Sequence, residues 1–452
     1  MSESTSTLTA RIAQRVCGIG YAHLDAATIL VVKRLIMDGI AVAIAGTAQP
    51  APQLIADYAR DQAARARSTV WCFGFDTSPA LAAYVNAASM HVLDFEPMSS
   101  PPTHAVSPTV PAAFALGQAL GAHGRDIVAA CAKGFELQGR VLLASGHARG
   151  ELPFHTPGVV GVMGSTAAAS HLLGLDAIQL AHAFGISTSR CGGLAANTGS
   201  MVKCTHCGNA AAAGVEAATM AQHGFTAHPD IFSAPKGYIA TFFPLHFDDD
   251  ALLGYGAPFR CVDPGMAIKF YPSKYPTHFV IAAALALRQR IGNPLRIRTL
   301  KILAPDIEDA DRPLPRSGLE GKFSFQYTSA IALLDGQVGI GAFTDERRFR
   351  ADVVALLARI TVERDPAVPR DTRNMQVELH LTLDDGQVYV ERCGAPPGSW
   401  GRVFDTTMHE AKLRDCLGIR LAPAQSDCVL EVLARLDQAS PADVAKLMAM
   451  LA

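Results

Sequence analysis

The spacing of apolar residues predicts that the first half of this chain is mostly helical. Leu35, Ile36 and Ile40 recur at nearly helical intervals within a longer apolar segment. Ser78 followed by Pro79 is typical of an N-cap and a first helical position. These features predict helices over residues 26–45, 80–90, 127–145, 176–183 and 209–222, the last of which is very rich in alanine.

The pattern changes after about residue 264, where alternating apolar and polar residues predict strands. Residues 295–303 alternate over most of their length. Residues 375–383 and 387–391 flank a turn that contains Gly386 and predict a β-hairpin. Helical signal over residues 323–334 and 352–357 separates these strands, and it returns from 405 to 451.

These elements predict a mainly α protein with an inserted α+β domain. A chain of 452 residues is too long for one compact core. We expect a large all-helical domain made of residues 1–265 and 405–452, and a smaller α+β domain over residues 266–404. Because both junctions of the smaller domain connect to the same helical body, we expect it to act as a lid that hinges over that body.

Composition and charge exclude some classes of function. The hydrophobic fraction is 49% and aromatics make up 7%, which favours a large interior of closely packed helices. The formal net charge of −2 provides no strong attraction for nucleic acid or acidic lipid. The sequence holds no run of eighteen apolar residues, so we expect no membrane span.

The cysteines and the first residues predict a cytoplasmic protein. The chain starts without the positive segment and apolar stretch of a secretory signal. Ten cysteines are scattered over the whole length, a distribution typical of reduced thiols. Cys204 and Cys207 have C-x-x-C spacing, but no second pair at a useful distance supports a zinc site, so we interpret them as buried thiols.

Candidate chemistry is concentrated between residues 103 and 209, where ionisable residues lie in sequence rich in Gly and Ala. Thr103 and His104 form one group, and His155 precedes a helix rich in small residues. Lys203 and His206 are three apart and share a face if that segment is helical. Histidine titrates near neutral pH and lysine carries a fixed positive charge, which together suit proton transfer on an anion.

Each of these residues also has a purely structural interpretation. His155 could be a histidine that bonds to the backbone of a turn, and Lys203 with His206 could form a solvated helix face. Asp94 follows an apolar helix, and it could either end that helix or orient His104.

A second polar group lies at the start of the smaller domain. Lys274, Tyr275 and His278 are close in sequence and are interleaved with prolines that stiffen the segment. In a lid, such a segment could close over the site. The alternative is a stiff surface turn. The sequence lacks the glycine-rich motifs of nucleotide sites and the G-x-S-x-G motif of hydrolases, so we expect no nucleotide cofactor.

The ordered series of motifs resembles the MmgE/PrpD family over nearly the full length. No single motif is diagnostic, but their order is specific. The segments that carry the resemblance are 88–95, 103–104, 154–157, 171–186, 201–203, 206–211, 271–273, 322–327, 334–336, 343–345 and 397–399.

The resemblance implies a helical domain, a smaller α+β lid and a homodimer. It also implies a site that handles small di- or tricarboxylates without a metal or an organic cofactor. The family's site residues fall on Asp94, His104, His155, Lys203 and the segment around Lys274 and His278.

We therefore predict an enzyme that transfers a proton at a carbon next to a carboxylate. The leading hypothesis is dehydration of a 2-methylcitrate-like hydroxy acid. The alternatives are a cis-aconitate-type decarboxylase, an iminodisuccinate-type epimerase and a non-catalytic carboxylate-binding protein. The predicted catalytic residues are His104, His155, Asp94, Lys203 and Tyr275, and the predicted substrate-binding residues are Lys203, His206, Lys274, His278 and Thr103.

Overall fold

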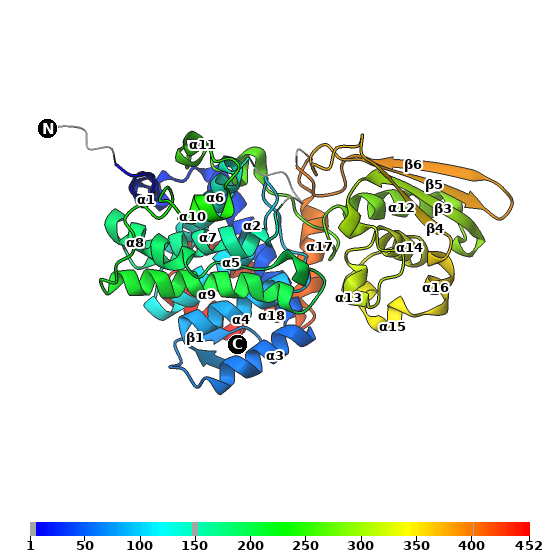
Figure 1. Ribbon diagram of the computed structural model, residues 1–452. Helices are drawn as coiled ribbons and strands as arrows, with labels where there is room; N and C mark the ends of the chain where they lie inside the picture. Colours follow the sequence, from blue (N-terminus) through cyan, green and yellow to red (C-terminus); the bar gives the residue numbers. More distant parts are fainter. Residues whose placement is uncertain (1–5, 147–151, 401) are drawn as a thin grey trace. The chain divides into compact units, whose positions relative to one another are not determined.

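The protein divides into two compact units in its computed structural model, which describes residues 6–146, 152–400 and 402–452 (Figure 1). The first unit comprises Met1–Val92, Glu96–Ala267 and Thr406–Ala452. The second comprises Ile268–Asp405 together with the short segment Leu93–Phe95. The chain thus enters the second unit twice, and the first time for three residues only.

The first unit is built from helices that pack on one another. Helices α4, α5, α6, α7 and α9 pack together, and Figure 1 shows α7 and α9 side by side. None of the helices in the described part of the chain is long and apolar enough to cross a membrane. Its main helices are α1 (Leu8–Gly18), α2 (Ala26–Gly46), α3 (Pro50–Asp61), α4 (Pro79–His91), α5 (Val106–Leu120), α6 (Gly124–Ala144), α7 (Thr156–Leu172), α8 (Ala177–Thr188), α9 (Val202–Gln222), α10 (Tyr238–Phe242), α11 (Asp249–Leu253), α17 (Thr406–Leu417), α18 (Pro423–Ala434) and α19 (Pro441–Met450).

Local capping explains where several of these helices begin. The Ser78 side chain accepts a hydrogen bond from the Leu81 N–H before α4. Asp176 caps α8 and forms a capping box with Gln179. Helix α9 begins at Val202 rather than at residue 209. The prediction placed the start too late because it relied on alanine, which the first turns of this helix lack.

A short hairpin in the first unit was not predicted. Strand β1 (Ser68–Val70) pairs antiparallel with β2 (Phe75–Thr77). Each strand has three residues, too few for an alternating pattern to be recognised in the sequence.

Small residues let the helices of the first unit approach closely. A Cβ atom on Gly214 of α9 would lie 2.2 Å from the Ser165 hydroxyl oxygen of α7. A Cβ on Gly208 of α9 would lie 2.5 Å from the Tyr84 ring of α4. Both distances are far below van der Waals contact, so only glycine permits these two helix crossings.

The second unit is a four-stranded mixed sheet with helices. The strands are β3 (Ile297–Pro305), β4 (Ile360–Asp365), β5 (Val377–Leu383) and β6 (Val388–Cys393), in the order β4-β3-β5-β6. Strands β3 and β4 are parallel, whereas the other two pairs are antiparallel. Helices α12 (Thr277–Ile291) and α14 (Phe325–Asp335) pack on each other, and α12 contacts the hairpin strands β5 and β6. Strand β4 was not predicted.

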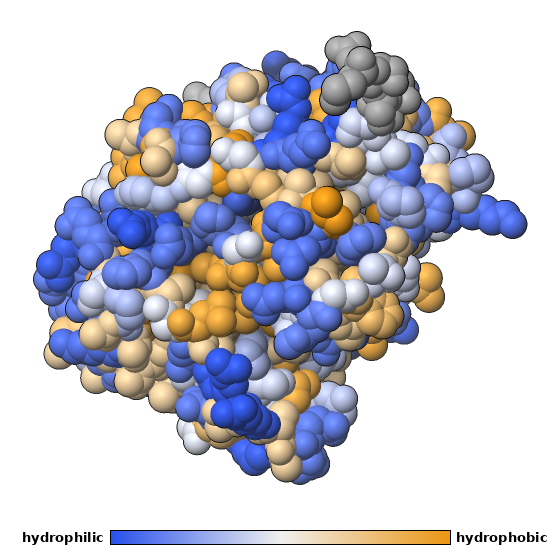
Figure 2. Space-filling model, turned by 90° about the vertical axis from the view of Figure 1, so that its left-hand side faces the viewer, coloured by the Kyte–Doolittle hydropathy of each residue, from blue (hydrophilic) through white to orange (hydrophobic). Residues whose placement is uncertain are grey.

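Apolar side chains gather near the middle of one face, with hydrophilic residues around them (Figure 2). Among the large hydrophobic residues exposed in the first unit are Ile178, Leu194 and Phe225, at 71%, 67% and 60% exposure.

A buried ion cluster ties the returning C-terminal helices to the N-terminal part of the first unit. Asp38 of α2 is fully buried, and Lys412 Nζ of α17 lies 2.8 and 2.9 Å from its two carboxylate oxygens. His409 Nε2 of the same helix lies 2.9 Å from Asp38 Oδ2. The carboxylate thus holds α17 against α2 across a long stretch of sequence.

We expect Asp38→Ala to lower the free energy of unfolding by about 3–5 kcal/mol, because it leaves a buried cation without its carboxylate. The measurement is chemical denaturation followed by circular dichroism. The control is Asp57→Ala, which removes an exposed pair with Arg60 and should cost about 1 kcal/mol or less. Equal losses in the two variants would contradict this role for Asp38.

Candidate active site

A buried carboxylate with two imidazoles and a hydroxyl close to it lies at the centre of the candidate site. Glu96 follows α4, and its side chain is fully buried. Its Oε1 atom lies 2.5 Å from His91 Nδ1, 3.0 Å from His104 Nδ1 and 2.6 Å from Ser107 Oγ. His91 is the last residue of α4, His104 comes shortly before α5 and Ser107 is in its first turn. One oxygen atom therefore joins two imidazoles and two helices.

The first turns of α9 add a cation and another imidazole to this group. Lys203 Nζ lies 2.9 Å from His91 Nε2. His206, one turn further along α9, has its Nδ1 atom 3.1 Å from His155 Nδ1. The ring centroids of His91 and His155 are 5.2 Å apart. We use the name histidine cluster for His91, His104, His155 and His206 together with Glu96 and Lys203.

The position of His155 depends on small residues around it. It occupies the N-cap position of α7, and its backbone N–H donates to the Gly193 carbonyl over 2.8 Å. A Cβ atom on Gly158 would lie 2.1 Å from the Gly192 carbonyl oxygen, so the first turn of α7 needs glycine there. The low bulk that the sequence shows around His155 is what allows this segment to lie against the start of α9.

Burial and charge keep three imidazoles of the cluster neutral. Burial, and then the nearby Lys203 ammonium, lower the pKa of His91 to about 3. The same two causes lower the pKa of His155 well below its ordinary value and also lower that of His206. Burial opposes ionisation of Glu96, but its histidine partners hold the pKa of this carboxyl well below the usual range. At neutral pH the cluster therefore contains a carboxylate and the neutral imidazoles of His91, His155 and His206.

Three of these residues have the geometry of metal ligands. One ligand atom each from His91, Glu96 and His104 lies within 4.8 Å of the others. Histidine nitrogen and carboxylate oxygen are ligands that divalent transition metals accept. However, Lys203 contacts the second nitrogen of His91 as a donor, which requires the proton of a neutral His91 to be on Nδ1, the atom that a metal would need. The contacts favour hydrogen bonding over metal coordination.

The residues beside the cluster are less reactive. Thr103 is buried, and its hydroxyl accepts a hydrogen bond from Thr156 Oγ1 over 3.2 Å. Cys204 and Cys207 are both free and buried, as we interpreted them, and burial raises the pKa of the Cys204 thiol to about 12. A thiol with such a pKa is neither a good nucleophile nor a ready metal ligand at neutral pH.

Asp94 is counted in the second unit, where it contacts a buried lysine. Lys269 is fully buried and makes an ion pair with the Asp94 carboxylate, and its ammonium also donates to the Asp94 carbonyl over 2.7 Å. Lys322 Nζ donates to the Leu93 carbonyl over 2.9 Å. Two buried lysines therefore hold the segment Leu93–Phe95 in the second unit. The orienting role of Asp94 stays a prediction.

The other predicted residues of the second unit lie at the start of α12. Lys274 makes an ion pair with Asp309. Tyr275 and His278 are fully buried, with ring centroids 5.1 Å apart, and Tyr275 also packs against Trp400. His278 Nε2 lies 3.3 Å from the Ser273 carbonyl oxygen. Burial of this segment differs from the stiff surface turn that we considered as the alternative.

The structure brings His104, His155, Lys203 and His206 together in the first unit. Sequence analysis missed His91 and Glu96, which complete the cluster. The available signal was the run from His91 to Glu96, in which ionisable residues interrupt an apolar segment. Such groups are rarely buried without partners, so the run could have indicated a polar site.

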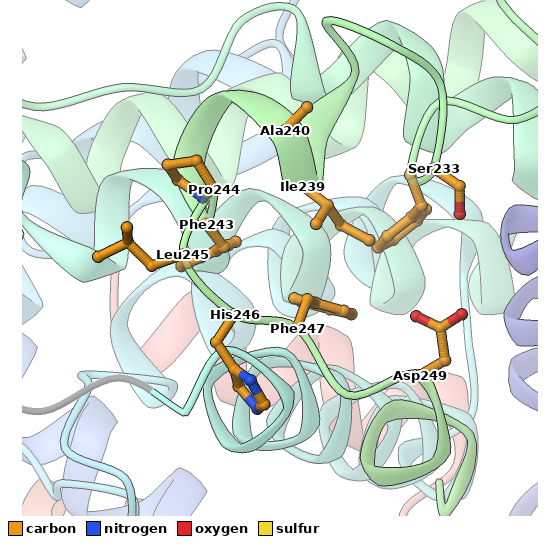
Figure 3. A pocket seen from close by; sticks show the side chains of 10 residues that line it. Ser233, Ile239, Ala240, Phe243, Pro244, Leu245, His246, Phe247 and Asp249 are labelled. Carbon is orange, nitrogen blue, oxygen red and sulfur yellow. The ribbon is translucent and has the colours of Figure 1, made fainter.

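A separate pocket of about 410 Å³ lies elsewhere in the first unit, around α10 (Figure 3). Its lining includes Phe243, His246 and Asp249, and it shares no residue with the histidine cluster. Phe243 packs against Phe154, the neighbour of His155, with ring centroids 6.0 Å apart. We place the candidate active site at the histidine cluster rather than at this pocket, because the carboxylate, the imidazoles and the ammonium gather in the cluster.

Comparison with known proteins gives the family. Residues 10–248 match the MmgE/PrpD N-terminal domain, and residues 271–438 match the MmgE/PrpD C-terminal domain. The chain belongs to the MmgE/PrpD family. This confirms the resemblance seen in the sequence.

Individual MmgE/PrpD relatives include decarboxylases and a dehydratase. Cis-aconitate decarboxylase of Mus musculus is 32% identical over 409 residues, which cover 87% of this chain and 83% of the relative. The human cis-aconitate decarboxylase is 29% identical over 422 residues, covering 90% and 87%. The 2-methylcitrate dehydratase of Cupriavidus necator is 28% identical over 348 residues, covering 70% and 67%. These relatives are enzymes, and the lyase class fits them.

We expect the free energy of unfolding of this MmgE/PrpD protein to fall as the pH is lowered from about 6.5 to 5. Unfolded histidine takes up a proton near pH 6.5, whereas folded His91 stays neutral down to about pH 3. The unfolded state therefore binds more protons in this window, and His91 alone contributes a slope of about 1.4 kcal/mol per pH unit.

The measurement is chemical denaturation at a series of pH values for the unmodified protein and for His91→Gln. In the variant, the dependence of the unfolding free energy on pH should be smaller by the uptake of about one proton, which is about 1.4 kcal/mol per pH unit. An unchanged slope in His91→Gln would contradict the neutral, buried state of this imidazole.

Proposed function

We propose that this protein is a lyase that decarboxylates cis-aconitate or a closely similar unsaturated tricarboxylate. The observation that carries the proposal is the histidine cluster, in which the Lys203 ammonium contacts the neutral imidazole of His91 and acts electrostatically on those of His155 and His206. The relatives named cis-aconitate decarboxylase support this choice over dehydration, which the sequence analysis favoured, because they match more of the chain at similar or higher identity.

The charges of the cluster suit a small polycarboxylate. Lys203 supplies a cation that is 9% exposed, so its field is weakly screened by water. Imidazole N–H groups can add hydrogen bonds to carboxylate oxygens. A bound anion would also raise the proton affinity of His155, which burial and Lys203 lower in the free protein. Substrate binding and proton uptake by the imidazoles are thereby coupled.

The proposed reaction needs one acid and one cation. The carbon–carbon bond to a carboxylate on the carbon next to the double bond breaks, and carbon dioxide leaves. The electron pair of that bond forms a new double bond, and the electrons of the old one take a proton from His104 or His155 at the far carbon. Lys203 stabilises the negative charge that spreads onto a remaining carboxylate. Asp94 keeps the orienting role, and Tyr275 the catalytic role, that we predict for them.

Dehydration of a 2-methylcitrate-like hydroxy acid is the second candidate. The dehydratase relative favours it, and it uses the same groups: an imidazole takes the proton next to a carboxylate while an acid protonates the leaving hydroxyl. Because both reactions move a proton at a carbon beside a carboxylate, the cluster is compatible with either. The predicted homodimer stays a prediction.

We expect His155→Ala to lower kcat/KM for cis-aconitate by about 100- to 10,000-fold, because it removes a group that exchanges protons with the substrate. The assay measures carbon dioxide release and follows the alkene signals by NMR in deuterated water. The control is His171→Ala, which removes an imidazole outside the cluster whose Nδ1 atom also contacts a lysine, Lys133, at 3.0 Å. This control should keep full activity.

The same assay on a panel of small di- and tricarboxylates separates the alternatives. Alkene formation from a hydroxy acid without gas release would indicate the dehydratase. Deuterium uptake without net loss of substrate would indicate an epimerase. Binding without turnover of any of these acids would indicate a carboxylate-binding protein and would contradict the proposal.

We expect Lys274→Ala to raise KM about tenfold with little change in kcat, because we predict that this cation binds a substrate carboxylate. Asp309→Ala is the matched control, since it breaks the same ion pair but keeps the cation. If both variants changed the kinetics equally, the ion pair would be structural and the predicted role of Lys274 would be wrong.

A further inference from the structure

Glu96 occupies the centre of the histidine cluster, although it was not among the residues that the family resemblance indicated. We propose that Glu96 is a positioning residue, which favours the Nδ1 proton on His104, shares with Lys203 the fixing of the proton on His91 and, through His91, sets the direction of the Lys203 ammonium. The catalytic part of this inference rests on the proposed function. The hydrogen-bond pattern does not, because it follows from the contacts of the folded protein.

The proton position on His91 follows from its two partners. An ionised carboxylate only accepts hydrogen bonds, so the contact of 2.5 Å with Glu96 requires a proton on His91 Nδ1. A lysine ammonium only donates, so the contact of 2.9 Å with Lys203 requires a lone pair on His91 Nε2. His91 is therefore neutral with its proton on Nδ1, in agreement with its pKa of about 3. It links the carboxylate to the ammonium.

The same carboxylate oxygen sets the proton position on His104. Glu96 Oε1 lies 3.0 Å from His104 Nδ1, an ion-pair distance at which the negative oxygen favours a proton on Nδ1 over a lone pair. The other nitrogen, Nε2, then carries the lone pair of the neutral ring, so it is the atom that would take up a proton before His104 gives one to a substrate. A carboxylate that holds an imidazole in one tautomer is a recurring arrangement in active sites, where it also stabilises the imidazolium once it forms.

The charge of Glu96 should therefore affect the pH dependence of the reaction. The charged and titratable groups near His104 or its neighbour His91 include His91 of α4, Glu96 after it, His155 at the start of α7 and Lys203 of α9. Among these four, Glu96 is the group with a negative charge. Removing it disfavours the imidazolium, so the activity limb that reports His104 should move to lower pH.

The competing interpretation is a metal site formed by the same three residues. A metal would need the Nδ1 lone pairs of His91 and His104, which is the opposite proton arrangement. The two interpretations therefore predict different nitrogen signals for the same imidazoles. This makes the proton positions a direct test.

The experiment is nitrogen-15 NMR on histidine-labelled protein, with signals assigned through His91→Gln and His104→Gln. We expect both imidazoles of the unmodified protein to be neutral and protonated on Nδ1. In Glu96→Gln, His91 should keep this form, because Lys203 still donates to its Nε2, whereas His104 should become a mixture of tautomers. The kcat for cis-aconitate should fall about 10- to 100-fold with KM changed less than about threefold.

Two further variants make the test specific. Glu96→Asp keeps the negative charge. It should keep the His104 tautomer and the pH dependence of the unmodified protein, and its kcat should be higher than that of Glu96→Gln. Glu136→Gln is the matched control: Glu136 is also a fully buried carboxylate, with Arg140 Nε at 2.6 Å, but it lies outside the cluster. It should leave the histidine signals unchanged, even if the protein becomes less stable.

The outcomes separate this inference from the proposed function. Nδ1 without a proton on His91 or His104 in the unmodified protein would overturn the inference, as would one equivalent of bound Zn²⁺ that Glu96→Gln abolishes. So would an unchanged His104 tautomer and pH profile in Glu96→Gln. The expected NMR pattern in a protein that does not turn over any acid of the panel would leave the positioning intact and contradict only the proposed function.

Discussion

The charge of one buried carboxylate is the constraint on which the candidate site depends. A carboxylate that has lost its water is unstable unless hydrogen bonds and cations replace that water. At Glu96 the replacements come from His91, His104 and Ser107, which lie on or beside α4 and α5. Lys203 then brings the start of α9 to His91. The need to satisfy this charge therefore draws three helices and their imidazoles to one place.

Close helix packing makes this arrangement possible. Glycine at positions 208 and 214 lets α9 approach α4 and α7 more closely than any side chain with a Cβ would allow. Gly158 does the same at the first turn of α7, beside His155. Because this close packing excludes water, the pKa values of His91 and His155 fall. The free protein therefore holds neutral imidazoles near the Lys203 ammonium. A polycarboxylate would supply the negative charge that such a site lacks.

The same physical arrangement can serve more than one reaction of a small acid. Decarboxylation and dehydration both need a proton moved at a carbon beside a carboxylate and a cation near the charge that develops there. The family thus sets the scaffold, whereas in our proposal the bond that breaks depends on how the substrate lies against His104, His155 and Lys203. This is why the relatives of one family carry the names of both enzymes.

The sequence by itself determined the local features of this protein. The caps at Ser78 and Asp176 and the hairpin turn at Gly386 depend on neighbouring residues, and a short window of sequence contains them. Lys203 and His206 could be assigned to the same face from the sequence, because residues three positions apart on a helix lie on one face. The tertiary structure alone decided the partners: His91 and Lys203 are 112 positions apart, and Glu96 could have faced water. Strand β4 likewise became a strand through pairing with β3, which lies far from it in sequence. Contacts of this kind depend on how several helices or strands pack at once, and no local pattern records that packing.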